Sequence, residues 1–148
     1  MAVTVRPLRD RDFFPWLDLF AGYCSFYEVE VTDEKALRVW SWISDKNHEL
    51  GGAAAHDDDG NLVGFVHYRE VPHTLTARRG LFLDDIYVKP EGRNAGVGHA
   101  LMAFAQVYAR ENDLSTIELV TKPDNKEAQK LYDALGARTE WLTYEIEV

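Results

Sequence analysis

The chain has 148 residues, and its 25 acidic against 16 basic residues give a formal net charge of −9, which opposes binding to nucleic acid and favours cationic small molecules or basic tails. A chain of this length forms one domain that buries about two thirds of its unfolded surface, so it needs no disulfide, and its single cysteine, Cys24, cannot pair within the chain. No apolar stretch approaches the roughly 20 residues of a membrane helix, and the first ten residues lack a signal-peptide core, so we expect a reduced, cytoplasmic location and no membrane partner.

The first third of the sequence predicts one strand and two helices. Residues 2–7 alternate as a strand does, and residues 13–27 carry apolar side chains at helical spacing. Thr32 is typical of the cap that starts a helix, which predicts a second helix over residues 33–46. Both helices are rich in aromatic residues, which we interpret mainly as core packing or as a face that binds a partner, with a substrate wall as the alternative.

A hairpin is predicted next, with two strands within residues 51–71 and a turn at 57–60. The acidic triplet in that turn lacks the alternating ligands and the closing glutamate of a calcium loop, so we interpret it as turn chemistry. The polar composition of residues 71–80 predicts a loop. The five histidines show no metal-ligand spacing, and we predict no metal.

An apolar strand over residues 81–88 is followed by the glycine-rich stretch 93–98, from which a helix runs to about residue 110. The first N–H groups of a helix have no partner inside it, and the helix dipole adds positive charge there, so an anion should bind at this end. Gly96 and Gly98 allow close approach of the backbone, and Arg93 adds a cation. This combination suits a pyrophosphate.

Two nucleotide-binding loops do not fit this stretch. The P-loop requires lysine and a hydroxyl residue after its last glycine, but His99 and Ala100 follow Gly98. The dinucleotide fingerprint requires a third glycine, and Leu101 occupies that place.

The last third predicts a strand over residues 115–121, a helix from the cap Asn125 to the stop Gly136, and an alternating strand over residues 141–148. The complete predicted order is β-α-α-β-β-β-α-β-α-β. This is an α/β (α+β) fold in which helices flank a mixed central sheet.

Two motifs in this order resemble those of the GCN5-related N-acetyltransferase (GNAT) family. Residues 93–98 match its [RQ]-x-x-G-x-[GA] loop, and residues 125–137 match its N-x-x-A-x-x-x-Y-x-x-x-G-A helix. The resemblance implies one N-acetyltransferase domain over residues 1–148, acetyl-CoA as cosubstrate, and a central strand that separates from its neighbour to admit the pantetheine arm. It implies cofactor contacts from Ile86, Tyr87, Val88, Arg93, Asn94, Ala95, Gly96, Val97, Gly98, His99, Asn125 and Tyr132.

Acetyl transfer to an alkyl amine, whose pKa is about 10, requires a base at neutral pH. Strand alternation predicts that Asp84 shares a face with Ile86 and Val88, toward the acetyl group, while Asp85 points to the other face. Residues 84–88 also resemble the corresponding strand of the spermidine/spermine, thialysine and fungal histone/polyamine acetyltransferases. That resemblance implies Asp84 as the base and Asp85 as an anchor for the cationic end of the substrate. The alternative is a strand-end hydrogen-bonding pair.

Tyr132 stands at the tyrosine of the second motif, and the resemblance implies that it protonates the departing thiolate, with ring packing in the core as the alternative. We expect the acceptor to contact Tyr27, Glu28, Asp84 and Asp85 through charge and cation–π interactions, although Glu28 could equally be a solvated loop residue.

The predicted function is therefore an acetyl-CoA-dependent N-acetyltransferase that acts on a primary amine, such as a small amine, a polyamine or an amino acid, by direct attack in a ternary complex. The alternatives are a protein lysine or N-terminal acetyltransferase and a non-catalytic acyl-CoA-binding module. We also expect a homodimer, formed through the aromatic residues of the first two helices or through the last strand.

Overall fold

The computed structural model describes residues 2–93 and 95–148, so Asn94, a predicted cofactor contact, lies outside the described residues. Five strands form one sheet in the order of the chain, and all neighbours are antiparallel except the last two strands, which are parallel. The strands are β1 (Thr4–Pro7), β2 (Gly51–His56), β3 (Leu62–His73), β4 (Arg78–Val88) and β5 (Ile117–Glu118).

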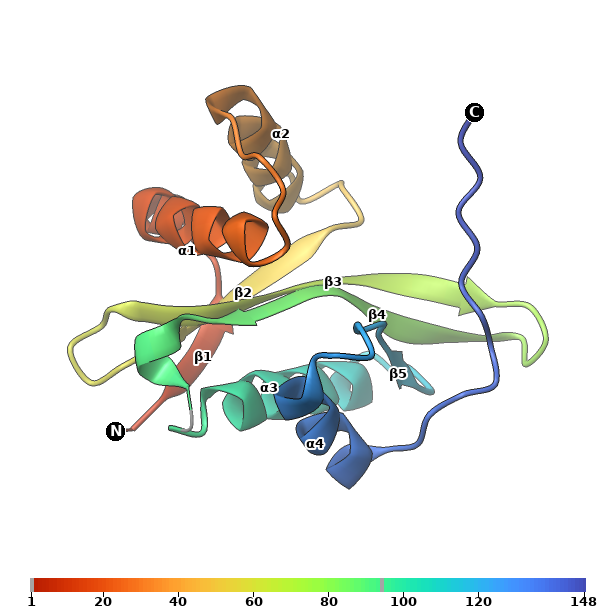
Figure 1. The fold of residues 1–148 in the computed structure, drawn as a ribbon. Coiled ribbons are helices and arrows are strands. Elements are labelled where there is room, and N and C mark those ends of the chain that lie inside the picture. The colour runs from red at the N-terminus through yellow and green to blue at the C-terminus, as the bar shows by residue number, and fades with distance from the viewer. Residues whose placement is uncertain (1, 94) are drawn as a thin grey trace.

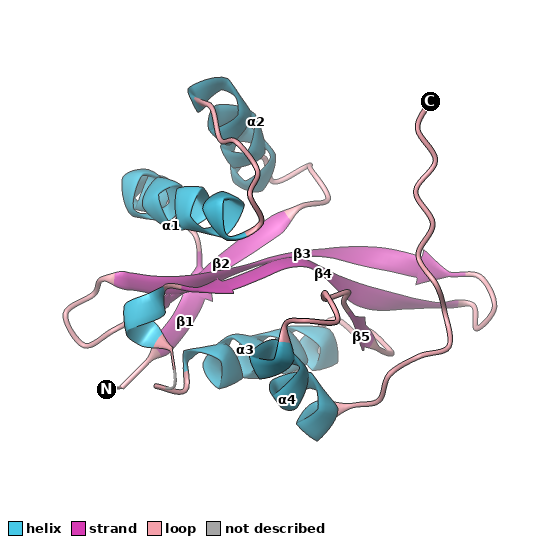
Figure 2. Cartoon of the chain, in the orientation of Figure 1, coloured by secondary structure: helices cyan, strands magenta, loops and turns pink. Residues whose placement is uncertain are grey.

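Helices cover both faces of this sheet (Figures 1 and 2). One face carries α1 (Phe13–Phe26) and α2 (Asp33–Ser44), and the other carries α3 (Val97–Glu111) and α4 (Lys126–Leu135). Short 3-10 turns, Asp10–Asp12 and Pro90–Gly92, precede α1 and follow β4. The predicted α/β class and the order of its first nine elements are confirmed.

The protein has two hydrophobic cores, one on each face of the sheet, and the side chains of β3 point alternately into one and the other. Val66 and Tyr68 pack toward α3 with Leu101, while Phe65 packs toward α1 with the fully buried Trp16. Burying one such aliphatic or aromatic side chain contributes roughly 1.5–3 kcal/mol, so the alternating strands hold the two helical layers to one sheet.

The caps and turns formed mostly where the sequence predicted them. The Thr32 hydroxyl accepts the Lys35 N–H at 3.2 Å, and the Asn125 side chain accepts the Ala128 N–H at 3.5 Å. The Asp57 carboxylate accepts the N–H groups of Asp59 and Asn61, which makes the acidic triplet part of a hairpin turn.

The loop predicted over residues 71–80 is wrong, because β3 continues to His73 and β4 begins at Arg78, with only residues 74–77 between them. Backbone pairing continues through polar residues here. The periodicity of apolar residues in a sequence indicates burial rather than backbone pairing. This end of the hairpin is paired but largely exposed, so its sequence lacks that pattern.

The alternation predicted for β4 is interrupted. The register passes from His67–Asp85 to Tyr68–Leu83, so Asp84 is an extra residue, a β-bulge. Leu83 and Ile86 consequently both pack in the α3 core, although an unbroken strand would place them on opposite faces. The prediction that Asp84 shares a face with Ile86 and Val88 is therefore wrong.

The end of the chain differs most from the prediction. The strand predicted over residues 115–121 is reduced to the two residues of β5, and residues 141–148 form no strand with any described part of the chain. This final segment runs from α4 past the β3–β4 end of the sheet to the C-terminus, and its residues are exposed (Figure 1). Its alternating pattern favours a strand, but a strand also requires an edge to pair with.

Candidate active site

A gap opens between the two parallel strands. β4 and β5 pair only at Leu81–Ile117 and Phe82–Glu118, so β5 leaves the edge of β4 from Leu83 to Val88 uncovered. Backbone N–H and C=O groups along such an edge can pair with amide groups of an extended ligand. The predicted separation of the central strand from its neighbour is present, and it places the backbone of Ile86, Tyr87 and Val88 at the gap.

An anion cradle lies at the start of α3. Gly96 precedes the helix with φ +81°, a left-handed conformation that favours glycine, and there is open space where its Cβ would stand. The Val97 side chain is buried in the core, so Val97 can offer a ligand only its backbone N–H. Ala95 is half-buried and His99 is exposed beside this helix start. The geometry suits a phosphate group that is bound by backbone donors.

Arg93 is held beside this cradle. Its Nε donates to the Val88 carbonyl oxygen at 3.1 Å, and its guanidinium lies 5.7 Å from the Phe26 ring centre and 6.0 Å from that of Tyr87. These contacts fix a permanent cation between the end of β4 and the start of α3.

Gly98 serves the packing of α4. A Cβ at this position would lie 3.2 Å from the Leu131 side chain, so the glycine lets α4 approach the first turn of α3. This close crossing places α4, which starts after the cap residue Asn125 and contains Tyr132, beside α3 on one face of the sheet (Figure 1).

Three polar side chains meet where α1 ends and α4 begins. Burial raises the pKa of Tyr132 to about 12, and the neighbouring Tyr27 adds to the shift. Burial also raises the pKa of Tyr27, while a hydrogen bond with Asn125 opposes the increase. Tyr132 therefore keeps its proton at neutral pH, and its hydroxyl can serve as a donor.

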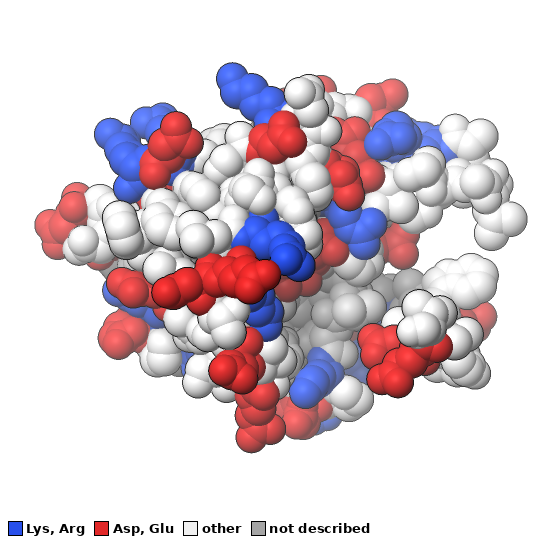
Figure 3. Space-filling model, turned by 90° about the horizontal axis from the view of Figure 1, so that it is seen from above, with Lys and Arg blue, Asp and Glu red and all other residues white. Residues whose placement is uncertain are grey.

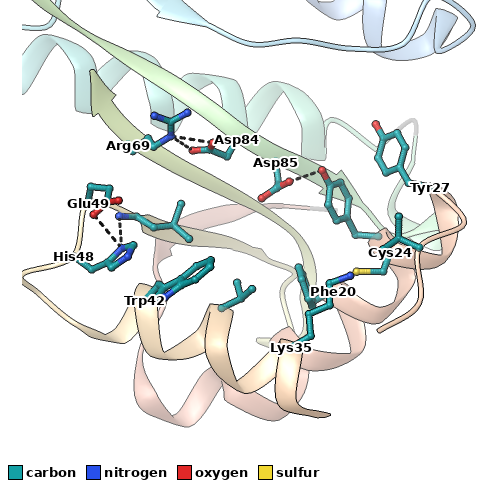
Figure 4. A pocket seen from close by; sticks show the side chains of 14 residues that line it. Phe20, Cys24, Tyr27, Lys35, Trp42, His48, Glu49, Arg69, Asp84 and Asp85 are labelled. Atoms are coloured by element: carbon teal, nitrogen blue, oxygen red, sulfur yellow. Dashed lines mark hydrogen bonds and ion pairs between the residues drawn. The ribbon is translucent and has the colours of Figure 1, made fainter. Parts of the chain in front are cut away.

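A cavity of about 550 Å³ lies between α1, α2 and the bulge of β4. Figure 4 shows Asp84 and Asp85 on the strand side of this cavity, across from Trp42 and Lys35 of α2. Tyr27 lines it as well, so the cavity extends to the Tyr132 neighbourhood. The charged and titratable residues that line the cavity are Lys35, His48, Glu49, Arg69, Asp84, Asp85, Tyr23, Tyr27 and Cys24.

Asp85 is held by buried partners. Trp16 Nε1 donates to His67 Nε2 at 3.0 Å, and His67 Nδ1 lies 2.8 Å from one Asp85 oxygen. Since an indole N–H can only donate, His67 Nε2 must accept, and the single ring proton sits on Nδ1 and points to Asp85. The Tyr23 hydroxyl donates to the other Asp85 oxygen. Burial would raise the pKa of Asp85, but these hydrogen bonds outweigh it and hold the pKa below its ordinary value of 3.8.

Asp84, the bulged residue, has a different environment. Arg69 Nε lies 3.0 Å from each Asp84 oxygen, in a half-exposed pair across β3 and β4. Burial raises the pKa of Asp84 above 3.8; Arg69 opposes this shift, and the Asp85 charge adds to it. Asp84 therefore binds a proton more readily than an ordinary aspartate does.

Comparison with known proteins agrees with this geometry. The sequence model of the "Acetyltransferase (GNAT) family" matches residues 16–137. The chain belongs to the GNAT family. Members of the family take the acetyl group from acetyl-CoA, so the predicted N-acetyltransferase class and its cosubstrate are confirmed.

Individual relatives of this GNAT enzyme act on different amines. It is 29% identical over 145 residues to the D-amino-acid N-acetyltransferase HPA3 of Saccharomyces cerevisiae, covering 96% of this chain and 89% of that one. It is 38% identical over 77 residues to the thialysine N-epsilon-acetyltransferase of Sus scrofa, covering 52% and 45%. A ribosomal-protein-alanine N-acetyltransferase from Brucella melitensis has a similar structure, with a TM-score of 0.83, 27% identity and full coverage of both chains.

The GNAT enzyme brings together most residues that the sequence singled out. Asp84, Asp85 and Tyr27 line one cavity, whereas Glu28 is exposed in the turn after α1 and is not among the residues that line it. Sequence reasoning missed His67 and the lining residues Arg69, Lys35, His48 and Glu49, whereas Trp42 belongs to the aromatic residues for which a substrate wall was the alternative. His67 could have been noticed, because a histidine within the apolar run LVGFVHY demands a buried partner.

The acidic excess of the GNAT enzyme extends to its surface. Acidic side chains are spread over the face that α1 and α2 cover, with basic ones among them (Figure 3). The net charge of −9 attracts cations to the protein as a whole. None of the helices in the described part of the chain is both long and apolar enough to cross a membrane.

Proposed function

We propose that this N-acetyltransferase acetylates the amino group of a small zwitterion, an amino acid or a close analogue. The observation that carries the proposal is the mixed charge of the cavity, in which Asp84, Asp85 and Glu49 share the lining with Lys35 and Arg69. A polyamine would require anionic groups alone, whereas a zwitterion requires both signs. The similarity to a D-amino-acid N-acetyltransferase supports the same class.

Each aspartate has a separate role in this proposal. Asp85 stays ionised, because its oxygens accept hydrogen bonds from His67 and Tyr23, and it attracts the ammonium form of the acceptor. Asp84, whose pKa is raised, takes the proton that the amine must lose before it can attack. Lys35 and Arg69 then attract the carboxylate of the acceptor.

The cradle at the start of α3 and Tyr132 would act on acetyl-CoA, the donor of the acetyl group. The N–H groups at the start of α3, with Arg93, would hold the pyrophosphate of acetyl-CoA, and the β4 edge would hold its pantetheine arm. Acetyl-CoA supplies an activated acetyl group and a thiolate leaving group. The Tyr132 hydroxyl holds the proton for the departing sulfur, since it remains protonated at neutral pH.

An acceptor panel tests the proposal. Thiol release from acetyl-CoA should be measured with D- and L-amino acids, the corresponding amino acid amides, polyamines and basic peptides. We expect turnover of amino acids, and a kcat/KM at least tenfold lower for the amides, which lack the carboxylate. Preference for polyamines or peptides would overturn the zwitterion assignment. Binding of acetyl-CoA without turnover on any amine would favour a non-catalytic binding module.

Tyr132→Phe tests the proton donor. Because only the hydroxyl is lost, we expect kcat to fall about tenfold or more with the KM for acetyl-CoA nearly unchanged. Steady-state kinetics with the best acceptor of the panel provide the measurement. An unaltered kcat would remove the donor role from Tyr132 and leave its ring as packing.

We also propose a cytoplasmic location and a homodimeric state for this enzyme. Fractionation of cells that express the full chain checks the location. Light scattering of the full chain during size exclusion checks the oligomeric state, and a mass equal to one chain of 16.9 kDa would contradict the dimer.

A further inference from the structure

One side of α2 faces the cavity. Lys35, Val39 and Trp42 follow one another at spacings of four and three, so they share one side of the helix, and all three line the cavity. Trp40, on another side of α2, packs on the buried Trp16 instead, with 5.0 Å between ring centres. Lys35 and Trp42 are about two helical turns, or roughly 10 Å, apart along the helix. The cavity side of α2 therefore carries a cation at one end and an indole at the other.

Trp42 is held in place but left partly uncovered. The His48 ring stacks on it, with 5.5 Å between ring centres and an angle of 6° between the ring planes. The Leu50 N–H donates to His48 Nδ1 at 3.0 Å, which fixes the orientation of the histidine ring. Trp42 is still 39% exposed, whereas Trp16 is fully buried. A rigid indole of this kind loses little freedom when a ligand packs on it, so it is well suited to bind one.

The helical side of the cavity continues this apolar surface. Besides Trp42, the residues from α1, α2 and the turn between them that line the cavity include Phe20, Cys24, Val29 and Val39. The two aspartates at the bulge of β4 lie on the opposite side, across the cavity from Trp42 (Figure 4). The cavity thus offers a charged side to the amino group of an acceptor and an apolar side to the rest of the molecule.

The cavity is too large for the smallest amino acids alone. Its volume of about 550 Å³ corresponds to about 18 groups of the size of a water molecule, at about 30 Å³ each. Glycine and alanine have far fewer non-hydrogen atoms than this. An aromatic amino acid, together with the acetyl group that it receives, would occupy most of the volume.

We propose that the acceptor carries an aromatic side chain, and that Trp42 selects this side chain by packing against its ring. The inference rests on the proposed function, because it takes the cavity as the acceptor site. Two aromatic rings in offset or edge-to-face contact attract each other more strongly than their buried area alone accounts for. Trp42 is therefore a specificity-determining residue, whereas the charged groups across the cavity act on the amino and carboxylate groups that all amino acids share.

A cationic side chain could also bind to an indole. Lys35, however, lies on the same side of α2 as Trp42 and would repel a second cation. Glu49 lines the cavity near His48, but its side chain is 69% exposed, so its charge is largely solvated. A neutral ring fits this end of the cavity better than an ammonium group does.

Four acceptors separate this inference from the proposed function: alanine, phenylalanine and the amides of both, each as the enantiomer that turns over faster. A single methylene in an apolar pocket already discriminates about 10–200-fold, so we expect kcat/KM to be at least tenfold higher for phenylalanine than for alanine. If the amides react as well as the acids, the zwitterion assignment fails, yet the ratio between the two amides still tests the ring. Equal kcat/KM for phenylalanine and alanine, or a preference for lysine over both, would overturn the inference.

Variants of Trp42 test the residue itself. Trp42→Ala should lower kcat/KM for phenylalanine at least tenfold more than for alanine, and Trp42→Phe, which keeps a ring, should restore most of the preference. Trp141→Ala is the matched control, because this indole is 77% exposed and lies outside the residues that line the cavity; the preference should persist. An equal loss for both acceptors in Trp42→Ala would make Trp42 a structural residue and overturn the inference.

Calorimetric titration provides a readout that does not require turnover. With CoA present, phenylalanine should bind the wild type at least tenfold more tightly than alanine does, equivalent to about 1.4 kcal/mol, and Trp42→Ala should abolish this difference. Equal affinities for the two amino acids in the wild type would overturn the inference even if no acceptor were acetylated.

Discussion

Asp84 and Asp85 are neighbours in the chain and line the same cavity, yet their surroundings push their pKa values in opposite directions. Asp84 faces one half-exposed guanidinium, and burial raises its pKa. Asp85 accepts hydrogen bonds from the fully buried His67 and from Tyr23, and its pKa is lowered. Two identical side chains therefore become suited to two different tasks, proton transfer and charge attraction.

The β-bulge makes this difference possible. Asp85 pairs with His67 across the strands, and both point to the α1 face, where Trp16 fixes the histidine tautomer. Without the extra residue, one of the two aspartates would point into the α3 core. The pair can line a single cavity only because the strand gains one residue at this position.

The largest effect should come from removing the base. Asp84→Asn keeps the shape and the Arg69 neighbourhood but cannot take a proton, so we expect kcat to fall about 100-fold, the low end of general base catalysis. Wild-type kcat should decline on the acid side as Asp84 becomes protonated, and the variant should lack that limb. A retained acid limb would assign the base to another group, such as a bound water.

Asp85→Asn should act on binding instead. The loss of one negative charge from the cavity should raise the KM for the acceptor about tenfold, equivalent to about 1.4 kcal/mol, while kcat changes less. Steady-state kinetics at saturating acetyl-CoA measure both parameters. If kcat falls more than KM rises, Asp85 rather than Asp84 takes part in proton transfer.

His67→Gln should produce a smaller effect of the same kind. A glutamine can still donate to Asp85 but cannot reproduce the link to Trp16, so we expect a several-fold higher acceptor KM and an unchanged KM for acetyl-CoA. The free energy of unfolding should fall by about 1–3 kcal/mol, since buried polar partners lose their hydrogen bonds.

His56→Gln is the matched control for that variant. His56 is also buried in the sheet, but it lies on β2, outside the residues that line the cavity, and its Nε2 has no partner among the described residues. Its substitution should leave the acceptor KM unchanged. Equal changes in both variants would reduce His67 to a structural residue.

The smallest effect should be a difference in the pH dependence of stability. Asp85 has a lowered pKa, so its contribution is present above its unfolded value of about 3.8 and is lost as the pH falls below it. Asp84 has a raised pKa, so its contribution is present below about 3.8 and is lost as the pH rises. The difference in unfolding free energy between wild type and each variant should be measured with urea on both sides of pH 3.8. With rising pH this difference should grow for Asp85→Asn and shrink for Asp84→Asn. Changes in the same direction would contradict the two environments.

Much of the fold was predictable because its cues are local. Apolar spacing located the four α-helices that the described residues form, Thr32 and Asn125 capped two of them as expected, and Gly96 marked the start of α3. The helix start that forms the cradle and the place of Tyr132 on α4 followed from motifs, whereas the predicted face of Asp84 did not hold. These features depend on neighbours within a few residues in the chain.

The remaining features depend on partners that are distant in the sequence. The bulge at Asp84 is a property of the pairing between β3 and β4, and Arg69 reaches the cavity only through that pairing. His67 meets Trp16 across 51 positions in the chain. Residues 141–148 have the pattern of a strand, but no local rule states which edge receives it.

The bulge at Asp84 also limits how this site can be copied. Grafting the two aspartates onto a regular strand of another protein would direct them to opposite faces, and one would lose access to the acceptor. Deleting one residue from β4 would have the same result here without changing either carboxylate. A transfer of this site to another protein must therefore include the β-bulge itself, together with His67 and Trp16, which hold Asp85 in place.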